Sequence, residues 1–221
     1  MPVRSTSTRV HSTPPFVPSR QSIINPMAQE TEGLLSPFLR NRRGRIAAAY
    51  LRPCANVLDL GSGTGLLRAF LSDTLKYTGV DSACGTIPAH AVPPPDRFVV
   101  LRGNVVHPDP ELLRLIEARG PFDGLAAIAF LEHIRDPAAT VRQFMPFLQP
   151  QALIVATTPR PSSRKVHDQL SRMGLCSRSA AEEHEAFLGR TALQRLGEAI
   201  SKRMIVYRRF LLGLNQVVVY R

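Results

Sequence analysis

The feature that most constrains this chain is an apolar run, Asn56 to Leu60, that leads directly into three closely spaced glycines, Gly61, Gly63 and Gly65. Apolar residues at helical spacing follow them. The pattern predicts a buried strand, a tight loop and a helix. Glycine permits positive φ and lets a ligand approach the main chain without meeting a Cβ, and the start of a helix offers unpaired N–H groups. The loop therefore predicts a site for a cofactor that contains adenosine.

The spacing of the glycines argues against a dinucleotide. A dinucleotide site requires the pattern G-x-G-x-x-G, in which the third glycine lets the helix pack closely on the strand. Counted from Gly61 the third position is Leu66, and counted from Gly63 it is Arg68. A pyrophosphate-binding loop is therefore not expected.

A second strand is predicted from Lys76 to Val80, and it ends in the acid Asp81. A carboxylate at the carboxyl end of a strand can accept hydrogen bonds from both ribose hydroxyls. The alternative is that Asp81 is an ordinary turn or N-cap residue. Because the glycine loop precedes it, we favour the ribose role and include the adjacent Ser82 in the site.

The segment from Val57 to Gly65 resembles the first motif of class I S-adenosylmethionine-dependent methyltransferases. The resemblance covers Leu35 to Arg221 and implies S-adenosylmethionine as the cofactor. It implies that Asp59 and the loop backbone, with Ser62 between the glycines, face the methionine half of that molecule. After the third strand an acid or amide meets the adenine in this family, and here that residue is Asn104, with the backbone of Val105 beside it. Gly103-Asn104 is also an ordinary turn pair.

Apolar runs alternate with helix-length segments along the chain, which predicts an α/β fold with a doubly wound, mostly parallel sheet. The family resemblance implies seven strands with an antiparallel C-terminal strand, and a terminal hairpin is predicted from 204–210 and 216–220. A basic amphipathic helix is predicted over 34–51, with its apolar face formed by Leu35, Phe38, Leu39, Ile46 and Tyr50. The prolines between 83 and 96 predict an irregular second crossover.

The chain divides into a tail and one domain. Residues 1–29 are basic and proline-rich and contain no acid, so we expect a disordered tail. A transit peptide, or a true start at Met27, are the alternatives. Residues 30–221 are expected to form a single methyltransferase domain, in which 159–203 cover the acceptor.

The segment Ala129 to Pro137 resembles the part of small-molecule and quinone-type methyltransferases that follows the fourth strand. This resemblance places Phe130 at the cofactor and Glu132 and His133 at the acceptor. A histidine titrates near neutrality, so His133 can take a proton from a hydroxyl, and Glu132 can orient it or bind the acceptor. The alternative is that both residues only shape the turn. The segment lacks the Asp/Asn-Pro-Pro-aromatic signature of many amino-directed methyltransferases, which argues against a nucleobase acceptor.

Charge and composition limit which kinds of partner the protein can have. The net charge of +11 is compatible with a nucleic-acid or anionic-lipid partner. We favour the alternative that the arginines are spread over solvated faces and a basic tail, because no known nucleic-acid motif appears. The three cysteines fit neither a disulfide framework nor a paired metal site, and no metal is expected. The apolar runs are too short to span a bilayer, so we expect a cytoplasmic protein without stable membrane insertion.

We therefore predict methyl transfer from S-adenosylmethionine to a small-molecule or lipid-like acceptor, most simply at oxygen. An RNA-directed methyltransferase and a catalytically inactive, cofactor-binding partner subunit are the alternatives. The sequence does not identify the acceptor or the oligomeric state.

Overall fold

The computed structural model describes residues 36–83, 97–161 and 188–221, which belong to one compact unit, Glu32–Arg221. Within them, one seven-stranded sheet has the order β3-β2-β1-β4-β5-β7-β6. Strands β1 to β5 pair in parallel, whereas β7 is antiparallel to both β5 and β6. This confirms the predicted fold class. The strands are β1 (Asn56–Leu60), β2 (Lys76–Asp81), β3 (Phe98–Arg102), β4 (Phe122–Ile128), β5 (Leu148–Pro159), β6 (Met204–Phe210) and β7 (Asn215–Tyr220).

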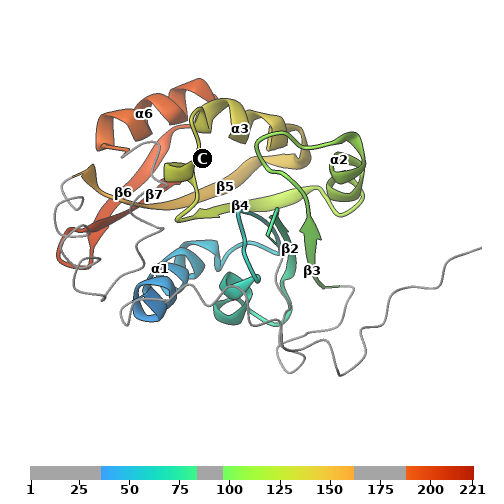
Figure 1. The fold of residues 1–221 in the computed structure, drawn as a ribbon, viewed down its shortest axis with the longest axis horizontal. Coiled ribbons are helices and arrows are strands. Elements are labelled where there is room, and N and C mark those ends of the chain that lie inside the picture. Colours follow the sequence, from blue (N-terminus) through green and yellow to red (C-terminus); the bar gives the residue numbers. More distant parts are fainter. Residues whose placement is uncertain (1–35, 84–96, 162–187) are drawn as a thin grey trace, which may run out of the picture. The chain divides into compact units, whose positions relative to one another are not determined.

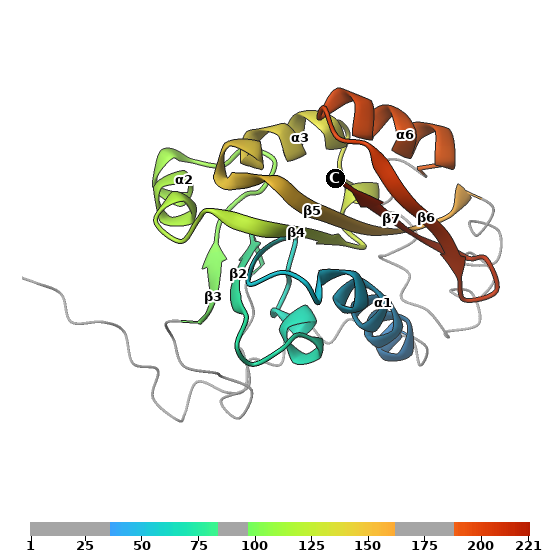
Figure 2. The same ribbon diagram turned by 180° about the vertical axis from the view of Figure 1, so that it is seen from behind.

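Helices cover both faces of the sheet (Figures 1 and 2). One face carries α1 (Ser36–Leu51) and the short η1 (Leu66–Phe70), and the other carries α2 (Pro110–Glu117), α3 (Pro137–Phe144) and α6 (Arg190–Ala199). Short turns of helix, η3 (Leu131–His133) and η4 (Met145–Phe147), follow β4 and α3. Two buried apolar clusters, one on each face, form the core. In the part of the chain that the structure describes, no helix is long and apolar enough to cross a membrane.

Helices α2 and α3 each begin at an aspartate followed by a proline. The carboxylate of Asp109 accepts a hydrogen bond from the backbone N–H of Leu112 at 2.8 Å, and that of Asp136 accepts one from Ala139 at 2.9 Å. These bonds satisfy N–H groups that have no partner inside the helix. The following proline lacks an N–H, so it is well suited to the first helical position.

Helix α1 buries a different face from the one that the sequence predicts. Phe38 is 58% exposed, and Ile46 and Tyr50 are only half-buried. A Cβ on Gly44 would lie 2.7 Å from the Phe70 ring, so the helix approaches η1 too closely for a larger residue. Small side chains allow this close approach, which is why the packed positions are Gly44, Ala47, Ala48 and Leu51.

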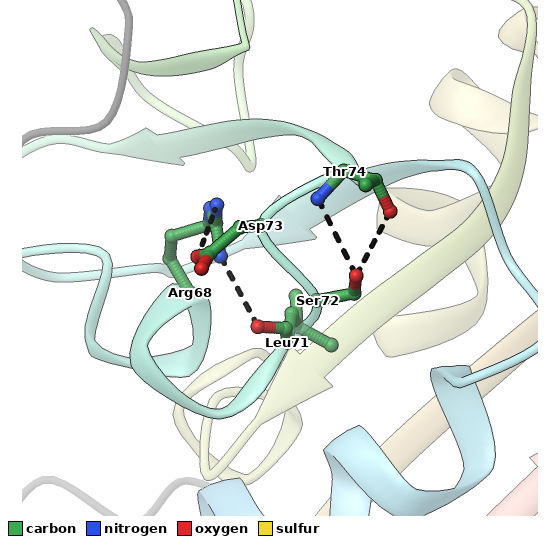
Figure 3. Close-up of polar contacts among 5 residues, drawn as sticks. All are labelled: Arg68, Leu71, Ser72, Asp73 and Thr74. Atoms are coloured by element: carbon green, nitrogen blue, oxygen red, sulfur yellow. Dashed lines mark hydrogen bonds and ion pairs between the residues drawn. The ribbon is translucent and has the colours of Figure 1, made fainter.

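The first crossover is a five-residue 3-10 helix, η1, where the sequence predicts a longer helix. Beyond it, Ser72 Oγ lies 2.8 Å from Thr74 Oγ1 and accepts from the Thr74 N–H at 3.3 Å (Figure 3). Arg68 donates to the Leu71 carbonyl at 3.2 Å and pairs with Asp73 at 3.3 Å. These local bonds compete with helical hydrogen bonds and end the helix early. The argument from a helix N-terminus is therefore not supported, and the glycine loop must hold a ligand by itself.

Some predictions fall outside the described residues. They concern the tail at 1–29, the second crossover at 84–96, most of the acceptor cover at 159–203, and Cys84 and Cys176. Cys54 is described and is a free, buried thiol, as predicted.

Candidate cofactor and acceptor site

The glycine loop folds back over the end of β2. The N–H groups of Gly61 and Ser62 both donate to the Val80 carbonyl oxygen, at 2.9 and 3.1 Å. The N–H of Gly65 donates to the Ser62 carbonyl at 2.9 Å, which closes the loop on itself. All three glycines have positive φ, at +69°, +54° and +77°. The loop therefore takes the backbone conformation for which the sequence uses glycine.

Asp81 fixes the loop from the neighbouring strand. One carboxylate oxygen accepts from the N–H of Gly63 at 2.7 Å, and the other accepts from the N–H of Ala83 at 2.8 Å. Each carboxylate oxygen has two acceptor positions, so the group can accept further hydrogen bonds. The side chain is only half-buried, so a ligand can reach it. The arrangement is compatible with the predicted ribose role.

The surroundings of the glycines differ in a way that marks the open side of the loop. A Cβ on Gly61 would lie 2.2 Å from the Phe130 ring, so this ring packs directly against the main chain. A Cβ on Gly65 would meet Phe98 at 3.0 Å. A Cβ on Gly63 would meet nothing within 4 Å. Gly63 therefore faces open space, where a ligand can contact the main chain.

Asp59 is a buried carboxyl group with one unpartnered oxygen. The Tyr77 hydroxyl donates to its Oδ2 at 2.6 Å, whereas Oδ1 has no partner among the described residues. Burial raises the pKa of Asp59 from 3.8 to about 7; the Tyr77 hydrogen bond opposes this, and the charge of Asp81 adds to it. A cationic group next to Asp59 would favour its ionised form.

The residues present fit S-adenosylmethionine. One buried oxygen in the strand that leads into the loop, Asp59 Oδ1, has no partner among the described residues. Buried polar atoms without partners are uncommon in native proteins, and each calls for an explanation. The sulfonium and ammonium groups of the cofactor are cations, and an ionised Asp59 would supply the complementary charge.

The loop after β3 is joined to the same site. The N–H of Gly103 donates to the Asp81 carbonyl at 3.0 Å. The Asn104 side-chain oxygen accepts from Val106 N–H at 2.8 Å and His107 N–H at 3.1 Å, so it stabilises its own turn. Val105 is buried in the core, and Ser82 is exposed next to Asp81. The role of Asn104 in binding adenine stays a prediction. Because its side-chain oxygen already accepts these two bonds, the amide nitrogen is the atom that remains available to the adenine.

A second polar cluster lies at the end of β4. Glu132 is 1% exposed, and its Oε2 has no partner among the described residues. Burial raises the pKa of Glu132 from 4.5 to about 7, against the lowering effect of the nearby Arg43 guanidinium. Arg43 in α1 also donates to the side-chain oxygen of Asn215 in β7 at 2.8 Å. The buried hydroxyl of Thr157 in β5 likewise lacks a described partner.

His133 directly follows this buried acid and is half-buried. Its backbone N–H donates to the Phe130 carbonyl at 3.0 Å, which holds the short turn η3. The turn therefore fixes Phe130, Glu132 and His133 relative to one another, with Phe130 against the glycine loop. The catalytic roles of Glu132 and His133 stay predictions.

Sequence reasoning missed four residues, Tyr77, Gly79, Arg43 and Asn215, that lie next to the predicted ones or support them. Tyr77 binds Asp59, and Gly79 makes room for it, because a Cβ there would lie 2.5 Å from Ser62 Oγ and 3.1 Å from the Tyr77 ring. A tyrosine two positions before a glycine in the second strand is the available signal. No sequence signal marks Arg43 or Asn215, since these residues come into contact only when α1 packs across the sheet.

Among residues 36–83, 97–161 and 188–221, no group of three or more His, Cys, Asp or Glu side chains could hold a metal ion.

Comparisons with known proteins agree with this fold. The model of the methyltransferase domain family matches residues 31–200. The mitomycin 7-O-methyltransferase MmcR is 18% identical with a TM-score of 0.57; the match covers 84% of this chain and 54% of MmcR. Human N-acetylserotonin methyltransferase, solved with S-adenosylmethionine, is 15% identical with a TM-score of 0.59, over 85% of this chain and 53% of that one. The chain thus spans about half the length of these two enzymes.

A third structure is similar in length to the chain. It is the methyltransferase complexed with the Haloferax volcanii Trm112 activator, which is 13% identical with a TM-score of 0.60 over 83% of this chain and 92% of that one. At such identities these likenesses show the fold alone. No curated protein sequence matches the chain.

The family match covers more than half of the chain, and the sheet order and the glycine loop agree with the predicted resemblance. The chain therefore belongs to the methyltransferase domain family, and the class I S-adenosylmethionine-dependent fold predicted from its sequence is confirmed.

Proposed function

We propose that this protein binds S-adenosylmethionine at the glycine loop and methylates a hydroxyl group of a small-molecule or lipid-like acceptor. The observation that carries the proposal is the loop itself: Asp81 accepts a hydrogen bond from Gly63, Gly63 faces open space, and the buried Asp59 Oδ1 has no partner among the described residues. Two of the structural neighbours are methyltransferases of small molecules, mitomycin and N-acetylserotonin. That likeness supports an acceptor of the same class.

The residues divide the work between cofactor and acceptor. Asp59, Ser62 and Asp81 hold the cofactor, and Phe130 packs beside them. S-adenosylmethionine supplies a methyl group activated by its sulfonium charge, so the protein mainly aligns the acceptor and excludes water. His133 takes the proton from the acceptor hydroxyl.

Glu132 is a buried acid that lies near the Arg43 guanidinium and directly precedes His133. Its carboxyl group is fully enclosed, so we assign it to positioning His133 and the turn η3 rather than to proton transfer. A Glu132→Gln variant keeps the shape and removes the charge, and is expected to change the pH profile of turnover more than the cofactor affinity.

An acceptor panel tests the proposal. Hydroxylated apolar compounds are incubated with S-adenosylmethionine and either the wild type or His133→Ala. The demethylated form of the cofactor, which is released at each turnover, is then measured. We expect turnover to fall by about 100-fold or more in the variant with unchanged cofactor affinity. Unchanged turnover removes His133 from the mechanism. Cofactor binding without product from any acceptor would instead favour the inactive partner subunit.

We also propose that the protein acts in the cytoplasm, which the free thiol of Cys54 supports. Fractionation of cells that express the tagged chain tests this, and recovery from an oxidising compartment would contradict it.

A further inference from the structure

Two residues of the predicted apolar face of α1, Ile46 and Tyr50, line an open cavity. Ile46 and Tyr50, with Arg42 and Ala49, face the sheet edge formed by β6 and β7. Together with Arg208 and Phe210 of β6 they enclose about 140 Å³. This groove lies on the α1 face of the sheet, beyond the Arg43–Asn215 contact rather than at the glycine loop. The groove is therefore separate from the predicted cofactor site.

The groove combines apolar walls with uncompensated positive charge. Arg42 and Arg208 each make no ion pair with a carboxylate among the described residues, and neither α1 nor β6 contains an acid. Guanidinium groups bind phosphate oxygens with paired, charge-assisted hydrogen bonds. The apolar side chains between them do not suit a free inorganic ion. The chemistry fits a phosphate attached to an apolar body.

The turn that follows Phe210 exposes a leucine from a strained backbone. Leu212 is 102% exposed. Leu211 and Leu212 have φ of +52° and +54°, a conformation that costs about 1–2 kcal/mol for each residue with a side chain. Two hydrogen bonds keep the turn in place, from Gly213 N–H to the Phe210 carbonyl (3.1 Å) and from Leu214 N–H to the Leu211 carbonyl (3.0 Å). Positive φ is usual in tight hairpin turns, but glycine, asparagine or aspartate normally occupies such positions, so two leucines are an uncommon choice here.

The turn and the beginning of α1 lie on the same side of the described unit in both views (Figures 1 and 2). Phe38, near the beginning of α1, is the second large apolar side chain exposed there, at 58%. Exposed apolar side chains next to arginines are the pattern by which proteins lie on a membrane surface without crossing it.

We propose that the groove and the turn 211–214 form a docking surface for an anionic phospholipid bilayer. Arg42 and Arg208 bind a lipid phosphate, the groove walls contact the apolar part of that lipid, and Leu212 enters the acyl region. A single-stranded RNA would use the arginines and Tyr50, but it gives no role to the exposed leucine. The docking does not require methyl transfer, so it can be tested without cofactor or acceptor.

Sedimentation of the full chain with vesicles tests the proposal. Vesicles of phosphatidylcholine alone are compared with vesicles that also contain phosphatidylglycerol. We expect binding to the anionic vesicles, a loss of about fivefold for each of Arg42→Gln and Arg208→Gln, and a loss of about tenfold or more for Leu212→Ser.

Matched controls lie at the opposite end of the sheet. Arg102→Gln removes the same charge from the other edge strand, β3, and Leu115→Ser removes a leucine that is 43% exposed in α2. Equal losses in the control and groove variants would overturn the proposal, because they show binding by overall charge. Binding to polyuridylate that depends on Arg42 and Arg208 but not on Leu212, without vesicle binding, would overturn it in favour of RNA. Thermal unfolding confirms that each variant is folded.

Discussion

The buried carboxyl of Asp59 makes the stability of the cofactor-free protein depend on pH. Its pKa is about 7 in the fold and about 3.8 when the chain is unfolded. Between these values the unfolded state releases its proton while the folded state keeps it. The free energy of unfolding is therefore highest, as far as Asp59 is concerned, below about pH 4. It falls as the pH rises and levels off above about pH 7.

The magnitude follows from the width of that window. From 3.8 to about 7 is a difference of about three pH units, and each unit corresponds to about 1.4 kcal/mol. The loss from this one group thus approaches about 4 kcal/mol. Asp59→Asn keeps an acceptor for the Tyr77 hydroxyl and cannot ionise, so we expect the variant to match the wild type at pH 4 and to exceed it by up to that amount at pH 8.

Urea unfolding of both proteins at intervals from pH 4 to pH 8 measures the difference. Asp123→Asn is a suitable control, because the carboxylate of Asp123 accepts from the N–H groups of Ala55 and Asn56 at 2.8 Å each and its replacement should destabilise the fold. Parallel pH profiles for the wild type and Asp59→Asn would refute the reasoning. The more stable variant should also bind S-adenosylmethionine at least tenfold more weakly, since a neutral amide cannot balance the sulfonium charge.

Three further predictions concern the same site. Gly61→Ala should destabilise the protein by about 1–3 kcal/mol and abolish cofactor binding, because its Cβ meets Phe130 and φ is positive; thermal unfolding checks this, and partial recovery is expected with Phe130→Ala added. Tyr77→Phe should cost about 1–3 kcal/mol in urea unfolding, since Asp59 loses its donor; a neutral result would mean that the hydroxyl bond contributes nothing. Glu132→Gln should stabilise the protein above pH 7, because burial raises the pKa of Glu132 from 4.5 to about 7, and by less than Asp59→Asn because this pKa shift is smaller than that of Asp59; a loss of stability at pH 8 would contradict this.

Sequence patterns correctly predicted those parts of the fold that depend on interactions between neighbouring residues. The strand before the glycine loop and the terminal hairpin both depend on residues close in sequence. The position of Asp81 beside the loop follows from the same local pattern, because the carboxyl ends of adjacent parallel strands lie at one edge of the sheet. Its hydrogen bond to Gly63 was not predicted.

The failures come from tertiary packing. Apolar spacing in α1 identified its larger side chains, but close approach to η1 selected Gly44 and the neighbouring alanines for the buried face. Side-chain bonds at Ser72 and Asp73 shortened the first crossover, although its apolar spacing is helical. Arg43 reaches Asn215 across 172 positions of sequence, and no short-range pattern encodes such a contact.

Calorimetric titration of S-adenosylmethionine into the wild type and Asp81→Ala tests the central claim most directly. The Asp81 carboxylate holds Gly63 and Ala83 and is the predicted ribose ligand, so the variant should lose both the loop geometry and the contact. We predict that the wild type binds the cofactor with a micromolar dissociation constant and that the variant shows no measurable binding. A cooperative unfolding transition would show that the variant is folded. Absence of binding to the wild type, or equal binding to both proteins, would contradict the account.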